Sequence, residues 1–85
     1  MDTSLVLWRC RRGIREMDLL LQKFVEIHFT SLSGEEQQAF LELLDETDMD
    51  IMDWIMERKE PPARAFKSLI NKIRAINGPV YPDRN

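Results

Sequence analysis

Apolar side chains recur every three or four residues through most of this chain of 85 residues, which is typical of helices that bury one face. The clearest stripe comprises Met17, Leu20, Leu21, Phe24, Ile27 and His28. It predicts a long helix that begins between Ile14 and Asp18 and ends near Phe29. No stretch of useful length alternates apolar with polar residues, so strands are not expected. The spacing therefore predicts an all-α fold.

Ser33 and Glu36 have the spacing of a capping box. The Ser33 hydroxyl can accept a hydrogen bond from the Glu36 amide, while the Glu36 carboxylate accepts one from the Ser33 amide. The pattern predicts a helix directly after Ser33. Its expected buried residues are Phe40, Leu41, Leu43 and Leu44.

Two more helices are expected in the second half. Thr47 or Asp48 can cap a short helix that ends before Pro61-Pro62. Its packing residues are Ile51, Met52, Trp54, Ile55 and Met56, and those of the last helix are Phe66, Leu69, Ile70, Ile73 and Ile76. Asn77-Gly78-Pro79 is expected to stop that helix.

A short opening helix over residues 5–11 completes a bundle of about five helices. We expect one domain over residues 1–85, with its core at about 5–78 and a loose tail at 79–85, since a chain of this length has room for one domain. The longest apolar runs, such as Leu5-Val6-Leu7-Trp8, are far below the ~18–20 residues of a membrane span. With no secretory pattern and a single Cys10, a reducing compartment is expected, by default the cytoplasm.

Charge is unevenly distributed along the chain, whose net charge is −3. Residues 1–15 carry four arginines and one aspartate, whereas residues 35–60 carry ten acidic and two basic residues. The acidic middle would repel phosphate backbones, so general nucleic-acid binding is not expected. The basic N-terminal part remains available to a partner.

Few residues suit catalysis or metal binding. His28 is the only histidine, and it is expected to be a partly buried helical residue. No nucleophile elbow or phosphate-binding loop is present. Asp45, Asp48, Asp50 and Asp53 lack the glycine and the closing glutamate of a calcium loop, and helix caps with a solvated acidic face explain them better. We therefore predict no catalytic residue, no metal site and no cofactor site.

The segment Trp8–Asp18 is unusual because four arginines and a tryptophan fall within eight residues. A structural explanation is that Gly13 ends the first helix and arginines stabilise its C-terminal end, which accounts for Gly13 and about two arginines. The alternative is a docking site at a tight corner, since arginine and tryptophan are favoured interface anchors. Glu16 would lie on the first turn of the second helix, where it can orient Arg12 or Arg15 or pair with a base on another protein.

Arg12-Gly13-Ile14-Arg15-Glu16 resembles the Arg-Gly-x-x-Glu motif of the SdhE family, small assembly factors for the flavoprotein subunit of succinate dehydrogenase. The resemblance covers residues 5–76. It continues in Phe24-Val25-Glu26, Ser31-Leu32-Ser33, Phe40 with Leu43-Leu44, and Asp48-x-Asp50-Ile51 with Trp54-Ile55. Phe29 stands where the family often has tyrosine, and Met49 replaces a frequent proline.

The resemblance implies a five-helix bundle that is a chaperone of flavinylation rather than an enzyme. Such a chain docks on the FAD-loaded flavoprotein subunit and favours the bond between the flavin 8α carbon and a histidine of that partner. The flavin supplies most of the chemistry, so FAD belongs to the partner and none is stably bound here. The resemblance leaves open whether the subunit of fumarate reductase is also a client; we expect a monomer in the bacterial cytoplasm.

Carried over residue by residue, the partner-binding positions are the motif residues Arg12, Gly13 and Glu16. We add an inferred rim of Trp8, Arg9, Arg11, Arg15, Met17 and Asp18, and expect the cationic and acidic side chains of this corner to point outward.

Two other functions are weighed against this one. An antitoxin-like regulator of the CptB type would also act by protein–protein binding, and a pull-down of partners discriminates it. A helix-turn-helix nucleic-acid binder would use residues 9–15, and its DNA retention would weaken steeply with salt.

Overall fold

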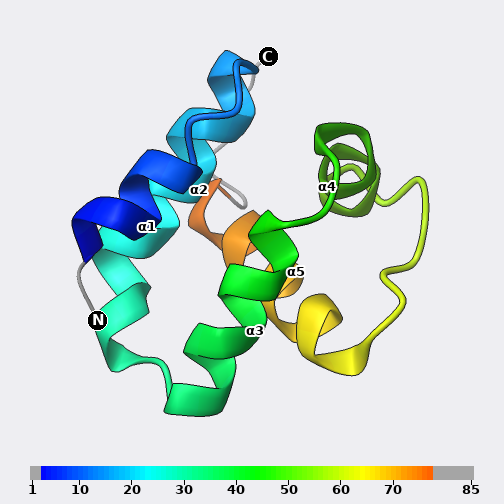
Figure 1. Ribbon diagram of the computed structural model, residues 1–85. Helices are drawn as coiled ribbons and strands as arrows, with labels where there is room; N and C mark the ends of the chain where they lie inside the picture. The colour runs from blue at the N-terminus through cyan, green and yellow to red at the C-terminus, as the bar shows by residue number, and fades with distance from the viewer. Residues whose placement is uncertain (1–2, 78–85) are drawn as a thin grey trace.

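Five α-helices and one short 3₁₀ turn make up the computed structural model, which describes residues 3–77 (Figure 1). The helices are α1 (Thr3–Arg9), α2 (Arg15–His28), α3 (Gly34–Leu44), α4 (Asp48–Ile55) and α5 (Arg64–Asn77), and the 3₁₀ turn η1 is Phe29–Ser31. No strand occurs within the described residues. The all-α, five-helix prediction is confirmed.

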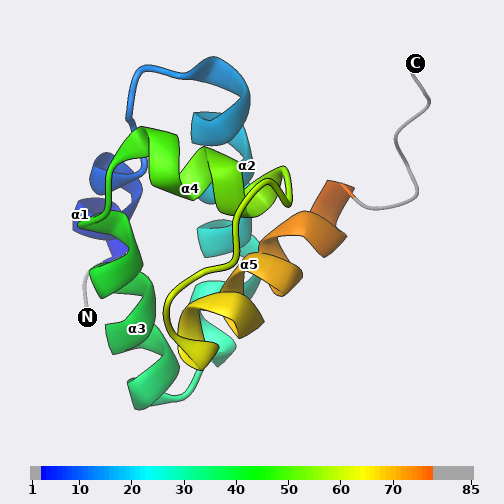
Figure 2. The same ribbon diagram turned by 90° about the vertical axis from the view of Figure 1, so that its right-hand side faces the viewer.

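Helix α5 holds the bundle together, because it packs against α2, α3 and α4. Helix α1 lies alongside α2, and the corner that joins them passes above α4 in the view of Figure 2. Aromatic rings fill the centre: the Phe24 and Phe40 ring centroids are 5.1 Å apart, and those of Trp54 and Phe66 are 5.8 Å apart. Contacts between offset or tilted rings stabilise such a core beyond the area they bury.

Local capping determines where two helices begin, as the sequence predicts. The Glu36 amide lies 3.1 Å from the Ser33 hydroxyl, and the Ser33 amide lies 3.0 Å from the Glu36 carboxylate, which completes the capping box. Thr47, rather than Asp48, caps α4 by accepting a hydrogen bond from the Asp50 amide at 3.1 Å. These caps satisfy amides that have no partner within the helix.

Four details differ from the prediction. The opening helix begins and ends two residues earlier than expected. Ile27 is 55% exposed because it lies at the edge of the α2 stripe, and Met56 is exposed because it follows the last residue of α4. Leu41 is only partly buried, and Ala39 takes a place in the core instead.

Some predictions concern residues that the structure does not describe. The stop signal Gly78-Pro79 and the tail at 79–85 lie outside the described residues. Between residues 3 and 77, none of the helices has the length and apolar character that crossing a membrane requires.

Candidate functional site

Asp18 organises the corner between α1 and α2 from the first turn of α2. Its carboxylate accepts hydrogen bonds from the Arg12 amide at 2.7 Å and from the Gly13 amide at 3.1 Å. Gly13 has φ of +97°, a conformation that side-chain-bearing residues rarely adopt. The glycine and the aspartate together fix the path of the chain from one helix into the next. Asp18, predicted to be a rim residue, therefore has an internal role.

Arg12 points into the protein, and the expectation that it points outward is wrong. Its side chain is only 14% exposed, and its Nε donates to the Asp48 carboxylate at 2.7 Å. Its two terminal nitrogens donate to the carbonyl oxygens of Leu44 and Glu46. The last carbonyls of α3 have no partner within that helix, and the planar fork of a guanidinium suits several acceptors at once.

Arg9 makes a similar connection one helical turn earlier. One terminal nitrogen donates to the carbonyl oxygen of Leu41 at 3.2 Å and forms an ion pair with Asp45. Asp45 and Asp48 are therefore partners of Arg9 and Arg12, in addition to lying on an acidic face. Sequence reasoning missed these pairs because nothing local links residues more than 30 positions apart.

The inner side of the corner is apolar. Met17 is 1% exposed, so its predicted place on an accessible rim is wrong: it is the first residue of the buried α2 stripe. Cys10 is also fully buried in the core, and burial raises the pKa of its thiol to about 12. Both residues support the corner from within.

The outer side of the corner carries the remaining predicted residues. Trp8 is 65% exposed, and the Arg11 guanidinium carbon lies 5.3 Å from the centre of its ring, a cation–π contact. Arg15 and Glu16 are exposed, and neither has an ion-pair partner within residues 3–77. A Cβ added at Gly13 would meet no atom within 4 Å, so the backbone there is open to close approach.

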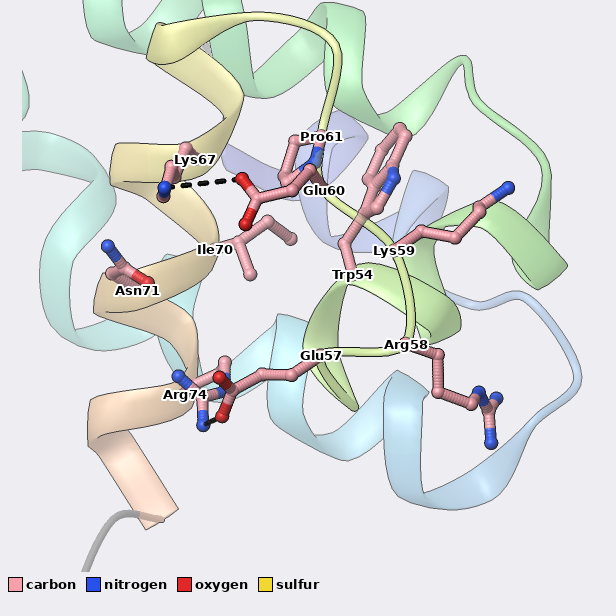
Figure 3. Close-up of a pocket in the computed structure, with 10 residues that line it drawn as sticks. All are labelled: Trp54, Glu57, Arg58, Lys59, Glu60, Pro61, Lys67, Ile70, Asn71 and Arg74. Carbon is pink, nitrogen blue, oxygen red and sulfur yellow. Dashed lines mark hydrogen bonds and ion pairs between the residues drawn. The ribbon is translucent and has the colours of Figure 1, made fainter.

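Away from this corner, a concave region of about 230 Å³ lies between α5 and the loop that follows α4 (Figure 3). Its charges are paired: Lys67 lies 3.2 Å from Glu60, and Arg74 pairs with Glu57. Figure 3 shows Arg58 and Lys59 extending away from α5, and both pair with aspartates of α4. This cleft offers a ligand no unpaired cation, so the α1–α2 corner is the stronger candidate.

Other chemistry finds little support in the described part of the chain. No group of three or more potential metal ligands comes together there. His28 is partly buried, with its ring centroid 5.5 Å from that of Phe24, as predicted for a helical histidine. Arg12 is turned inward and Arg9 is paired with Asp45, so Arg11 and Arg15 are the two arginines of the corner without an ion pair among the described residues, which is a small surface for phosphate backbones.

Residues 5–77 match the family model described as flavinator of succinate dehydrogenase. The chain belongs to this family. It is 40% identical over 70 residues to the FAD assembly factor SdhE of Coxiella burnetii. The aligned residues make up 82% of this chain and 85% of that protein. It is 40% identical over 76 residues to the SdhE of Yersinia pseudotuberculosis, with 86% of each chain covered, and 36% identical over 69 residues to that of Acinetobacter baylyi, with 81% of each covered.

Membership of the flavinator family confirms the resemblance that the Arg-Gly-x-x-Glu motif suggests. In this chain the motif has an inner and an outer part. Arg12 faces the bundle, whereas Gly13 and Glu16 face solvent. The partner-binding role of these residues stays a prediction, and the geometry divides them into residues that build the corner and residues that a partner can reach.

Proposed function

We propose that this chain is an assembly factor that binds the flavoprotein subunit of succinate dehydrogenase and promotes the covalent attachment of FAD to it. The observation that carries the proposal is the family match over residues 5–77, together with relatives named FAD assembly factors that cover four fifths or more of the chain. The exposed outer side of the α1–α2 corner supplies a docking surface.

The chain contributes binding rather than a catalytic group. The flavin is itself the electrophile, and the partner supplies the histidine that becomes bonded to it. A helper that binds more tightly to the subunit in which flavin and histidine are aligned raises the population of that arrangement. In this proposal FAD enters with the partner, and bond formation proceeds within the partner's own site.

Docking is assigned to the exposed residues Glu16, Arg15, Trp8 and Arg11, with the open backbone of Gly13 between them. Arg and Trp are common interface anchors, and a rigid corner loses little conformational entropy on binding. Arg12, Met17 and Asp18 hold this surface in shape from inside, and the half-exposed Arg9 joins it to the end of α3 through Leu41 and Asp45. Their substitution is expected to act through the fold.

The experiment is co-expression of the chain with the flavoprotein subunit in cells that lack their own assembly factor, read by in-gel flavin fluorescence. Wild type is expected to restore covalent FAD, and Glu16→Ala to reduce it. The matched control is Glu35→Ala, because Glu35 is also an exposed acid on the first turn of a helix. Circular dichroism checks that both variants remain helical.

Gly13→Arg and Gly13→Ala separate crowding of the surface from backbone strain. Both variants place a side chain at φ of +97°, so both are expected to lose about 1 kcal/mol of stability or more. Only arginine projects into the open space at the corner. A larger loss of covalent FAD with Gly13→Arg supports docking there. Unchanged fluorescence with Glu16→Ala and Gly13→Arg would reject the corner, and no effect of wild type would reject the function.

The client range and compartment belong to the same proposal. The flavoprotein subunit of succinate dehydrogenase is the first client, and a pull-down tests whether the fumarate reductase subunit is a second. We place the chain in the cytoplasm as a monomer, in keeping with a single cysteine that is buried as a neutral thiol. Size-exclusion chromatography with light scattering tests the oligomeric state.

A further inference from the structure

The four arginines near the corner divide into two pairs. Arg9 and Arg12 are bonded to the end of α3 and the start of α4. Arg11 and Arg15 are exposed and make no ion pair within residues 3–77. The chain is acidic overall, so two accessible guanidinium groups without an ion pair among the described residues can attract an external anion.

Arg11 borders a shallow groove of about 490 Å³ between α1 and α2, which lie alongside each other in Figure 1. The groove is lined by Ser4, Leu7, Trp8, Arg11, Gln22 and Glu26. Leu5, one turn before Trp8 on the same face of α1, is 66% exposed. Trp8 thus brings exposed apolar surface to the groove beside the guanidinium, and Leu5 extends this surface along α1 outside the groove.

The contact with Trp8 prepares Arg11 for a carboxylate. The Arg11 guanidinium carbon lies 5.3 Å from the centre of the Trp8 ring, and no oxygen of the described residues accepts a hydrogen bond from this guanidinium, so its N–H groups remain available. A carboxylate can accept from two of these at once. The indole also restricts the long arginine side chain before a partner arrives, which lowers the entropy lost on binding.

Glu26 makes the two sides of the groove opposite in charge. It lines the α2 side, whereas Arg11 and Trp8 lie on the α1 side. A carboxylate on the partner is attracted to Arg11 and repelled by Glu26, and a phosphate backbone with regular negative charges would meet the same repulsion. These charges favour a protein segment with one acidic residue followed by neutral or basic ones.

We propose that the groove between α1 and α2 seats a segment of the partner that carries a carboxylate next to an apolar side chain. The carboxylate bonds to the Arg11 guanidinium, and the apolar side chain packs on Trp8 and Leu5. This inference rests on the proposed function, because the segment belongs to the flavoprotein subunit. It extends the docking surface from the motif along α1.

The test is the dissociation constant for the purified FAD-loaded flavoprotein subunit, measured by isothermal titration with wild type and single variants. We expect Arg11→Glu and Trp8→Ala each to weaken binding about tenfold or more, as for interface anchors. Arg11→Lys keeps the charge without the planar fork and is expected to fall between them and wild type. The matched control is Arg64→Glu, since Arg64 is exposed on α5 and also lacks an ion pair among the described residues.

The outcomes distinguish the groove from the function as a whole. Wild type that neither binds the subunit nor restores covalent FAD contradicts the proposed function, and the groove inference falls with it. Wild-type binding that Arg11→Glu and Trp8→Ala leave unchanged overturns the groove alone. An equal loss with Arg64→Glu also overturns it, because the attraction would then be general. The Arg11 and Trp8 side chains are exposed, so their substitution is expected to leave the melting temperature within a few degrees of wild type. This measurement verifies that the variants are folded.

Discussion

Arg12 and Asp48 are 36 residues apart in the chain, yet the Nε atom of Arg12 lies 2.7 Å from Oδ1 of Asp48. The same guanidinium donates to the carbonyl oxygens of Leu44 and Glu46. One side chain thus joins the α1–α2 corner to the turn between α3 and α4. The proposed docking surface depends on Arg12, although Arg12 does not form part of it.

Arg12→Ala is expected to lower the free energy of unfolding by about 2 kcal/mol or more, because it leaves a partly buried carboxylate and two carbonyl groups without their donor. Asp48→Asn is expected to cost less, about 1 kcal/mol, since the two carbonyl contacts remain. Urea denaturation followed by circular dichroism measures both changes. A double variant tests whether the two losses are coupled.

The comparison variant is Arg11→Ala, which removes a guanidinium from the same segment but breaks only an exposed cation–π contact. Its stability is expected to stay within about 1 kcal/mol of wild type. If Arg12→Ala proves as stable as Arg11→Ala, then the contacts of Arg12 with α3 and α4 do not hold the corner in place.

Helix positions could be predicted from the sequence because their causes are local. Ser33 and Glu36 are three residues apart, and so are Thr47 and Asp50, so the capping pattern can be read directly from the chain. The inward turn of Arg12 could not be predicted in this way. The sequence alone does not distinguish the four arginines from one another. Only tertiary packing brings the end of α3 to Arg9 and Arg12.

The buried position of Met17, unlike that of Arg12, could have been predicted from the sequence. Met17 belongs to the apolar stripe that predicts α2, and a residue of that stripe faces the core rather than a partner. Glu16 precedes it by one residue, which turns its side chain by about 100° around the helix. The position of a residue around the helix therefore predicts whether it is accessible or buried, whereas its place in or beside the motif does not.

Acid is expected to destabilise the fold partly through Glu36. A hydrogen bond from Lys72, at 2.9 Å, and then one from the Ser33 amide hold the pKa of Glu36 below its ordinary value of 4.5. The unfolded chain takes up this proton at a higher pH than the folded chain does. The stability that ionised Glu36 contributes to the fold is thus fully present above about pH 4.5 and is lost as the pH falls through the lowered pKa.

Glu36→Gln tests this dependence, because glutamine keeps the acceptor for the Ser33 amide but removes the charge. We expect a smaller fall in melting temperature between pH 5 and pH 3 than in wild type, measured by circular dichroism. Some fall should remain, since Lys59 lowers the pKa of Asp50 as well. Glu35→Gln is the control on the same helical turn, and an equal effect of both variants would point to the helix dipole instead of the Lys72 contact.

Glu57 adopts φ of 61°, the left-handed region that costs a residue with a side chain about 1–2 kcal/mol. Its carboxylate pairs with Arg74 at an exposed site, and such pairs contribute less than about 1 kcal/mol. Glu57→Asn is therefore expected to raise the free energy of unfolding by about 0.5 kcal/mol, because asparagine tolerates this conformation better. Glu60→Asn removes the exposed pair with Lys67 without a positive φ, so urea denaturation should show no gain. If Glu57→Asn is less stable than Glu60→Asn, the contact with Arg74 outweighs the backbone strain.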